Sequence, residues 1–193
     1  MARSPRTRAR TASRFAAVQA LFQTEQAGDS AEAVIDQFIK HRLGDLSSPA
    51  APFLAAPQQL ASQDSNFPVG GSRGSGSQGG GFISGGFEDG RVPDAEVPLF
   101  ARVVRGAVLR QDAIDAMLSE ALPADWPLAR IDPVLRALLR AAAAELYMPD
   151  GPPAKVVINE YLDVARGFFT GAEPGMANAV LDRLARLLRQ AEF

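Results

Sequence analysis

The chain of 193 residues contains no cysteine and a single histidine, His41. The lack of cysteine excludes disulfides, thiolate metal sites and a cysteine nucleophile. A Ser-His-Asp triad or a multi-histidine metal site would have to be built around His41 alone, and we expect this residue to lie exposed at a helix end. The carboxylates Glu145, Glu160 and Asp163 fall on expected helices without a recognisable cleft, and the last two have the spacing of a solvated face. The sequence therefore offers no argument for catalysis, and it predicts no catalytic, metal-binding or cofactor-binding residues.

Long apolar runs are also missing, and none approaches the roughly 20 residues that a membrane span needs. The first residues, MARSPRTRARTASRF, are rich in Arg, Ser and Thr and contain no acid, as in a transit peptide. No apolar core of a secretory signal follows them. We therefore expect a cytoplasmic protein with no membrane partner.

Hydrophobic periodicity is absent from about Gly44 to Arg91, where Pro, Ala, Ser, Gln and Gly dominate. The spacing G-x-G-x-x-G at Gly74–Gly79 is that of a dinucleotide-binding loop, but neither a strand before it nor a helix after it is expected. Between Ser62 and Gly90 the only base is Arg73 in a net-acidic stretch, which argues against RNA binding by this segment. We expect residues 45–93 to be a flexible, low-complexity insertion.

On both sides of this tract apolar residues recur at intervals of three and four, which predicts helices. We expect Gly28 to end the first helix, Asp29 to cap the second, and Asp132 with Pro133 to begin the fifth segment. The expected helical segments are Ala12–Gln26, Ser30 to about Leu43, Val97–Leu122 with a kink near Gln111, a short turn after Pro127, Pro133–Tyr147, Pro153–Phe169 and Met176–Gln190. The predicted fold is all-α, a compact bundle of six or seven helices that forms one domain over residues 1–193.

The amino terminus is strongly basic, although the formal net charge of the chain is -2. The basic residues that precede the first acid, Glu25, are Arg3, Arg6, Arg8, Arg10 and Arg14. If the first helix extends back to about Thr7 or beyond, Arg6, Arg10 and Arg14 form an i, i+4, i+8 stripe beside its apolar face. Such a stripe suits phosphates, because a guanidinium makes planar, multidentate contacts with them. The alternative is a disordered, solvated basic tail.

Several stretches occur in the order found in one known family. They are RTASRFAAVQALFQ (Arg10–Gln23), WPLARID, LLRAAAAEL (Leu138–Leu146), PAKVVINEYLDVARGFF (Pro153–Phe169) and EPGMANAVLDRLAR (Glu173–Arg186). Together they resemble the NusB family of bacterial transcription antitermination factors, over about residues 6–43 and 94–190.

The resemblance implies an RNA-binding adaptor that is not an enzyme. Members of this family bind the boxA element of nascent RNA, classically in ribosomal RNA leaders, together with the small-subunit ribosomal protein NusE. That complex joins the elongating RNA polymerase and suppresses premature termination.

The resemblance also implies a set of RNA-facing residues, although this sequence departs from the family at several positions. Phe22 stands where the family often has tyrosine, and Leu135 where it commonly has glutamate, so any polar RNA contact at these positions is absent. The residues carried over as RNA-binding are Arg6, Arg8, Arg10, Arg14, Phe22, Met176 and Asn178.

Two alternatives remain open from the sequence. NusB-like domains also precede the catalytic domain of rRNA cytosine methyltransferases, where they help to hold RNA, so the chain could be a truncated enzyme. The second alternative is a helical protein-interaction module without an RNA role, in which the arginines form only a soluble tail.

Overall fold

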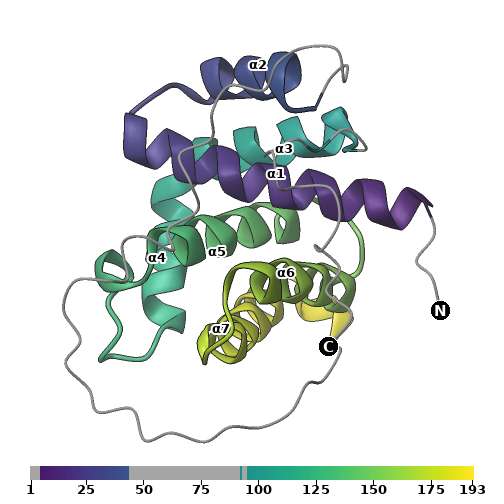
Figure 1. Cartoon of the computed structure of the whole chain (residues 1–193). Coiled ribbons are helices and arrows are strands. Elements are labelled where there is room, and N and C mark those ends of the chain that lie inside the picture. Colours follow the sequence, from purple (N-terminus) through teal and green to yellow (C-terminus); the bar gives the residue numbers. More distant parts are fainter. Residues whose placement is uncertain (1–4, 44–91, 93–94) are drawn as a thin grey trace, which may run out of the picture.

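The computed structural model describes residues 5–43, 92 and 95–193. Every regular element within these ranges is a helix, and seven α-helices pack into one bundle (Figure 1). The predicted all-α class and helix number are therefore confirmed. The insertion predicted at 45–93 falls, apart from residue 92, outside the described residues.

The first helix, α1, spans Pro5–Ala27 and packs against α3, α5 and α6. Because it begins well before Ala12, it carries Arg6, Arg8, Arg10 and Arg14 on helical backbone. It ends at Gly28, which has a φ of 71° and donates its amide to the Thr24 carbonyl over 3.0 Å. A positive φ favours glycine, so Gly28 ends the helix as predicted.

The second helix, α2, spans Ala31–His41, and its cap is one residue later than predicted. Ser30, rather than Asp29, is the N-cap, and its Oγ accepts a hydrogen bond from the Ala33 amide over 3.2 Å. His41 is exposed at the last position of the helix, as expected.

The two flanks of the insertion meet beside the end of α2. Val92 donates its amide to the Arg42 carbonyl over 2.8 Å, and the side chains of Leu43 and Val92 are both buried. The chain therefore leaves and re-enters the bundle at nearly the same place.

The long helix predicted over Val97–Leu122 is divided into α3, Val97–Leu109, and α4, Gln111–Ala121. Arg110 between them leaves the helical region, with φ -113° and ψ 19°. The break allows α3 to pack on α1 and α5 while α4 turns to pack on α5 and α7. The kink expected near Gln111 is thus a complete interruption.

The central helix is α5, Pro133–Leu146, in which nearly every residue is buried. Asp132 caps it by accepting hydrogen bonds from the amides of Val134 at 2.8 Å and Leu135 at 3.2 Å, and Pro133 occupies its first turn, as predicted. The short turn before it is the 3-10 helix η2, Leu128–Arg130.

The last two α-helices are α6, Ala154–Phe168, and α7, Glu173–Leu188, followed by the 3-10 helix η3, Gln190–Glu192. Helix α7 begins earlier than the predicted Met176. Phe168 at the end of α6 stacks on Phe15 of α1 with ring centroids 5.1 Å apart, which fixes α6 alongside α1.

Candidate nucleic-acid interface

Three arginines lie on the first turns of α1. Arg6 and Arg8 are exposed and Arg10 is half-buried, and Arg6 and Arg10 share one side of the helix because they are four residues apart. A cavity of about 350 Å³, here called the α1–α6 cavity, opens beside them and is closed on the other side by Val156 and Glu160. The predicted helical extension therefore places Arg6 and Arg10 at the edge of a hollow.

Arg14, the next residue of the predicted stripe, points into the protein and is 2% exposed. Its Nε and Nη2 donate to the Glu145 carboxylate over 2.9 and 2.6 Å, and its Nη1 donates to Glu160 Oε2 over 3.0 Å. Thr11 Oγ1 also donates a hydrogen bond to Glu160 Oε2 over 2.6 Å. Against the expectation from the sequence, Arg14 offers almost no surface to an RNA phosphate, and its contacts tie α1 to α5 and α6.

The charges of this buried cluster stabilise one another. Burial alone would lower the pKa of Arg14, but the hydrogen bond and charge of Glu145, with smaller contributions from Tyr161 and Glu160, raise it above its ordinary value. Burial also raises the pKa of Tyr161, and the nearby negative charge of Glu145 raises it further. The cluster therefore contains a charged arginine and a neutral phenol.

Sequence reasoning missed the role of two carboxylates. Glu145 is fully buried and Glu160 has a side-chain exposure of 13%, whereas the sequence placed Glu145 only on a helix and indicated a solvated face for Glu160. Asp163, in contrast, forms a surface ion pair with Arg166 over 2.8 Å. The burial of Glu145 could have been predicted from its position in LLRAAAAEL. It follows Leu138 by two helical turns, so both residues lie on the core-facing side of the helix.

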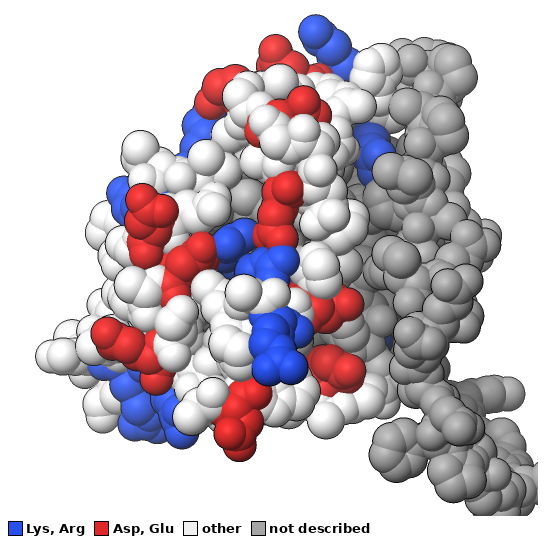
Figure 2. All heavy atoms as spheres, turned by 90° about the vertical axis from the view of Figure 1, so that its left-hand side faces the viewer, with Lys and Arg blue, Asp and Glu red and all other residues white. Residues whose placement is uncertain are grey.

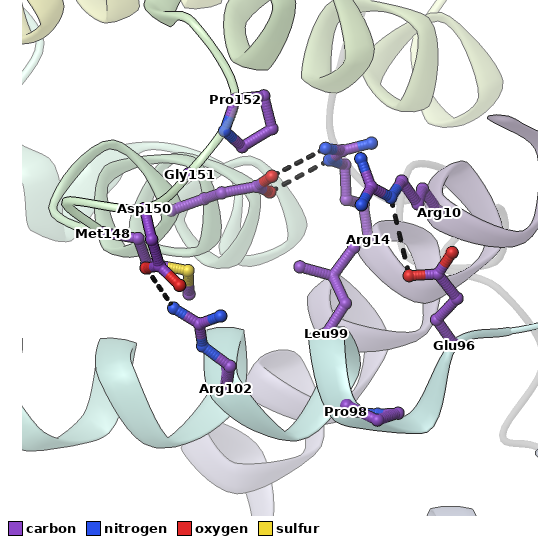
Figure 3. A pocket seen from close by; sticks show the side chains of 11 residues that line it. Arg10, Arg14, Glu96, Pro98, Leu99, Arg102, Met148, Asp150, Gly151 and Pro152 are labelled. Carbon is purple, nitrogen blue, oxygen red and sulfur yellow. Dashed lines mark hydrogen bonds and ion pairs between the residues drawn. The ribbon is translucent and has the colours of Figure 1, made fainter. Parts of the chain in front are cut away.

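A second cavity, here called the α1–α3 cavity, lies next to the first and has a volume of about 330 Å³ (Figure 3). Its walls come from α1, from the first turns of α3 and from the turn between α5 and α6. The two cavities share Arg10, Arg14 and Pro152, so they adjoin one another along the amino-terminal half of α1.

Two ion pairs stand at the rim of the α1–α3 cavity. Arg10 Nε lies 3.5 Å from Glu96 Oε2, and Arg102 Nη2 donates to Asp150 Oδ1 over 2.6 Å (Figure 3). The hydrogen bond from Arg102 lowers the pKa of Asp150 and so keeps this carboxylate charged. The sequence did not point to Arg102, Glu96 or Asp150, because only the tertiary fold brings α3 and the α5–α6 turn to the same cavity.

The other predicted RNA-binding residues lie elsewhere. Phe22 is half-buried against the core, about 12 Å further along α1 than Arg14. Met176 is half-buried and Asn178 exposed on the first turns of α7. None of these three residues lines either cavity, and neither does Arg8, so the cavities bring together only Arg6, Arg10 and Arg14 of the seven predicted residues. Leu135, which replaces the family glutamate, is a core residue with 1% exposure.

The opposite end of the bundle carries charges that are paired with one another. Glu25 accepts hydrogen bonds from Arg136 and Arg140, and Arg140 also donates to Asp115 over 2.7 Å. Figure 2, which views the molecule from the left-hand side of Figure 1, shows acidic and basic side chains interspersed over this face. These arginines are satisfied within the protein, whereas Arg6 and Arg8 project from the surface at the other end of α1.

No helix in the described part of the chain is both long and apolar enough to cross a membrane. Across residues 5–43, 92 and 95–193, no group of three or more His, Cys, Asp or Glu side chains could hold a metal ion.

The fold is an all-helical bundle with two adjoining cavities beside α1. A family model described as "NusB family" matches residues 83–186, more than half of the chain. Two curated relatives bear the name "Transcription antitermination protein NusB". The relative from Granulibacter bethesdensis is 57% identical over 97% of this chain and 94% of its own length, and that from Gluconobacter oxydans is 47% identical over 95% and 90%. The chain belongs to the NusB family.

A solved structure of NusB from T. maritima is similar in fold, with a TM-score of 0.61, 21% sequence identity and coverage of 100% of this chain and 99% of that one. The family model and the curated relatives confirm the resemblance inferred from the sequence. The relatives are named as antitermination proteins and not as enzymes, in agreement with the predicted absence of an enzymatic role.

Proposed function

We propose that this antitermination protein binds boxA-type single-stranded RNA of nascent ribosomal transcripts, together with the small-subunit ribosomal protein NusE. Through that complex it contacts the elongating RNA polymerase indirectly and prevents premature termination. Because antitermination takes place during transcription, the protein would act in the bacterial cytoplasm.

The observation that carries the proposal is the position of Arg6 and Arg10 on the first turns of α1, beside two adjoining cavities, with Arg8 exposed on the same turns. Guanidinium groups bind phosphates and stack on unpaired bases. The chain as a whole has a formal charge of -2, so this local basic surface, rather than the overall field, would attract RNA. A modest intrinsic affinity that a partner protein increases fits this charge distribution.

The predicted residues then divide into two roles. Arg6, Arg8 and Arg10 would contact the RNA backbone, and Phe22, Met176 and Asn178 would extend the surface along α1 and α7. Arg14 would act by holding α1 against α5 and α6 through Glu145 and Glu160. This division replaces a direct RNA contact by Arg14.

The double variant Arg6→Ala/Arg10→Ala tests the RNA-binding surface. Removal of two arginines that neutralise phosphates should weaken binding to boxA-type RNA, and it should reduce the slope of log K against log[salt] by roughly 0.7 for each phosphate that is no longer neutralised. Fluorescence anisotropy titrations at several salt concentrations measure both quantities. Arg105→Ala is the matched control, because Arg105 is an exposed arginine of α3 that pairs with Glu32 on α2.

Unchanged affinity and slope in the double variant would remove the RNA role from this surface. If the wild-type protein also failed to bind RNA, the chain would act as a protein-interaction module whose arginines are only solvated.

A further inference from the structure

The α1–α3 cavity has balanced charges, although three arginines line it. Arg10 stands beside Glu96, Arg102 is bound to Asp150, and the guanidinium of Arg14 is held by Glu145. An isolated phosphate would gain little inside this cavity, because Arg102 and Arg14 are hydrogen-bonded to carboxylates and only Arg10, at 3.5 Å from Glu96, is held loosely. A neutral group that offers both hydrogen-bond donors and acceptors matches these walls better.

The remaining walls are apolar. Leu99, Met148 and Pro152 are half-buried and line the same cavity as the ion pairs. Its volume of about 330 Å³ is at the lower end of the range, about 300 to 1,000 Å³, that holds small organic groups. A nucleobase combines apolar faces with a polar edge, and single-stranded RNA is read by bases that are splayed out of the strand.

The position of the cavity also suits a base of a bound strand. The α1–α3 cavity shares Arg10, Arg14 and Pro152 with the α1–α6 cavity, which Arg6 also lines. A strand whose phosphates lie along Arg6 and Arg10 can therefore turn one base into the neighbouring cavity. This step rests on the RNA binding proposed above.

We propose that the α1–α3 cavity binds one splayed base of the RNA, and that Arg102 and Asp150 read its polar edge. Their side chains are 52% and 64% exposed, so breaking this ion pair to contact a ligand requires little free energy. The guanidinium can then donate to a carbonyl oxygen and the carboxylate can accept from an amino group. Each of the four bases carries an acceptor next to a donor on its polar edge, so the pair can hold a base without selecting its type.

The test is a double-mutant cycle in which one change is made in the protein and the other in the RNA. Single abasic substitutions along a boxA-type RNA identify the nucleotide whose base is bound, and its loss should weaken binding to the wild-type protein by about tenfold. Arg102→Ala should weaken binding to intact RNA by a similar factor, but the abasic substitution should then have almost no further effect. Arg105→Ala is the control, because it is an equally exposed, ion-paired arginine on the same helix and lies outside the cavity.

Asp150→Ala tests the acceptor of the pair. It should also weaken binding to intact RNA, and the abasic substitution at the same nucleotide should then have almost no further effect. Thermal unfolding of each variant checks that it remains folded.

The outcomes separate the two proposals. If wild-type protein does not bind boxA-type RNA, with or without NusE, the proposed function is wrong and the base-binding cavity is wrong with it. If wild-type protein binds but the effects of Arg102→Ala and every abasic substitution simply multiply, the RNA role stands and the base-binding cavity is refuted.

Discussion

Replacement of Arg14 by alanine is expected to destabilise the helical bundle, although the residue belongs to the arginine stripe of α1. The variant removes three hydrogen bonds and leaves the carboxylate of Glu145, which is fully buried, without its arginine partner. Glu160 loses one of its partners at the same time. Any loss of RNA binding would then be indirect, because α1 would no longer be held against α5 and α6.

The magnitude follows from the burial of this pair. Loss of one partner of a buried ion pair typically costs about 3 to 5 kcal/mol, because the other charge stays buried and uncompensated. Since a domain has roughly 5 to 15 kcal/mol of stability, this is a large fraction of the total. For a chain of this size it corresponds to a decrease in Tm of roughly 6 to 20 °C.

Urea unfolding followed by far-UV circular dichroism measures this change. The control is Arg10→Ala, one turn earlier on α1, because the Arg10–Glu96 pair is long and partly exposed and should contribute less than about 1 kcal/mol. The double variant Arg14→Met/Glu145→Gln should be more stable than Arg14→Ala, since it removes both members of the most deeply buried pair.

The reasoning would be refuted if Arg14→Ala changed the free energy of unfolding by less than about 1 kcal/mol and still abolished RNA binding well below its Tm. That result would mean that Arg14 contacts RNA directly, as the stripe in the sequence implied.

Two further predictions concern the opposite end of α1 and the segment between α2 and α3. Hydrogen bonds from Arg136, aided by the charges of Arg136 and Arg140, lower the pKa of Glu25 in the folded protein, so its contribution to stability is present near neutral pH and is lost as pH falls through that lowered value. Wild-type protein should therefore lose more stability than Glu25→Gln between about pH 7 and pH 3 in urea titrations, and equal losses would contradict this role. We further propose that the chain is one domain into which residues 45–93 are inserted. Replacement of Ser47–Arg91 by a short Gly-Ser linker should leave the circular dichroism spectrum and RNA affinity unchanged, because the flanks already meet where Val92 bonds to Arg42; loss of either property would show that the segment is required.

Local features of the fold could be predicted from the sequence. Gly28 ends α1 through a positive φ, and Asp132 with Pro133 starts α5, because each effect depends on neighbouring backbone groups alone. The break at Arg110 was expected only as a kink, since it depends on α4 turning toward α7.

The candidate site was less predictable, because it depends on tertiary contacts. Residues four apart on a helix are rotated by about 40°, so Arg14 is turned by about 80° from Arg6 and faces the interior while Arg6 faces solvent. Arg102 and Asp150 are far apart in the sequence, and no spacing rule connects them. The sequence thus predicted the helix and its basic residues, but it could not predict which arginine is buried or which residues complete the hollow.

The most direct test of the proposed function is a gel-shift titration of the full-length protein with boxA-type RNA and with a scrambled RNA of equal length, with and without NusE. The account predicts a shift for boxA-type RNA that occurs at lower protein concentration when NusE is present, and a much weaker shift for the scrambled RNA. Equal affinity for both RNAs, or no RNA binding even with NusE, would contradict it.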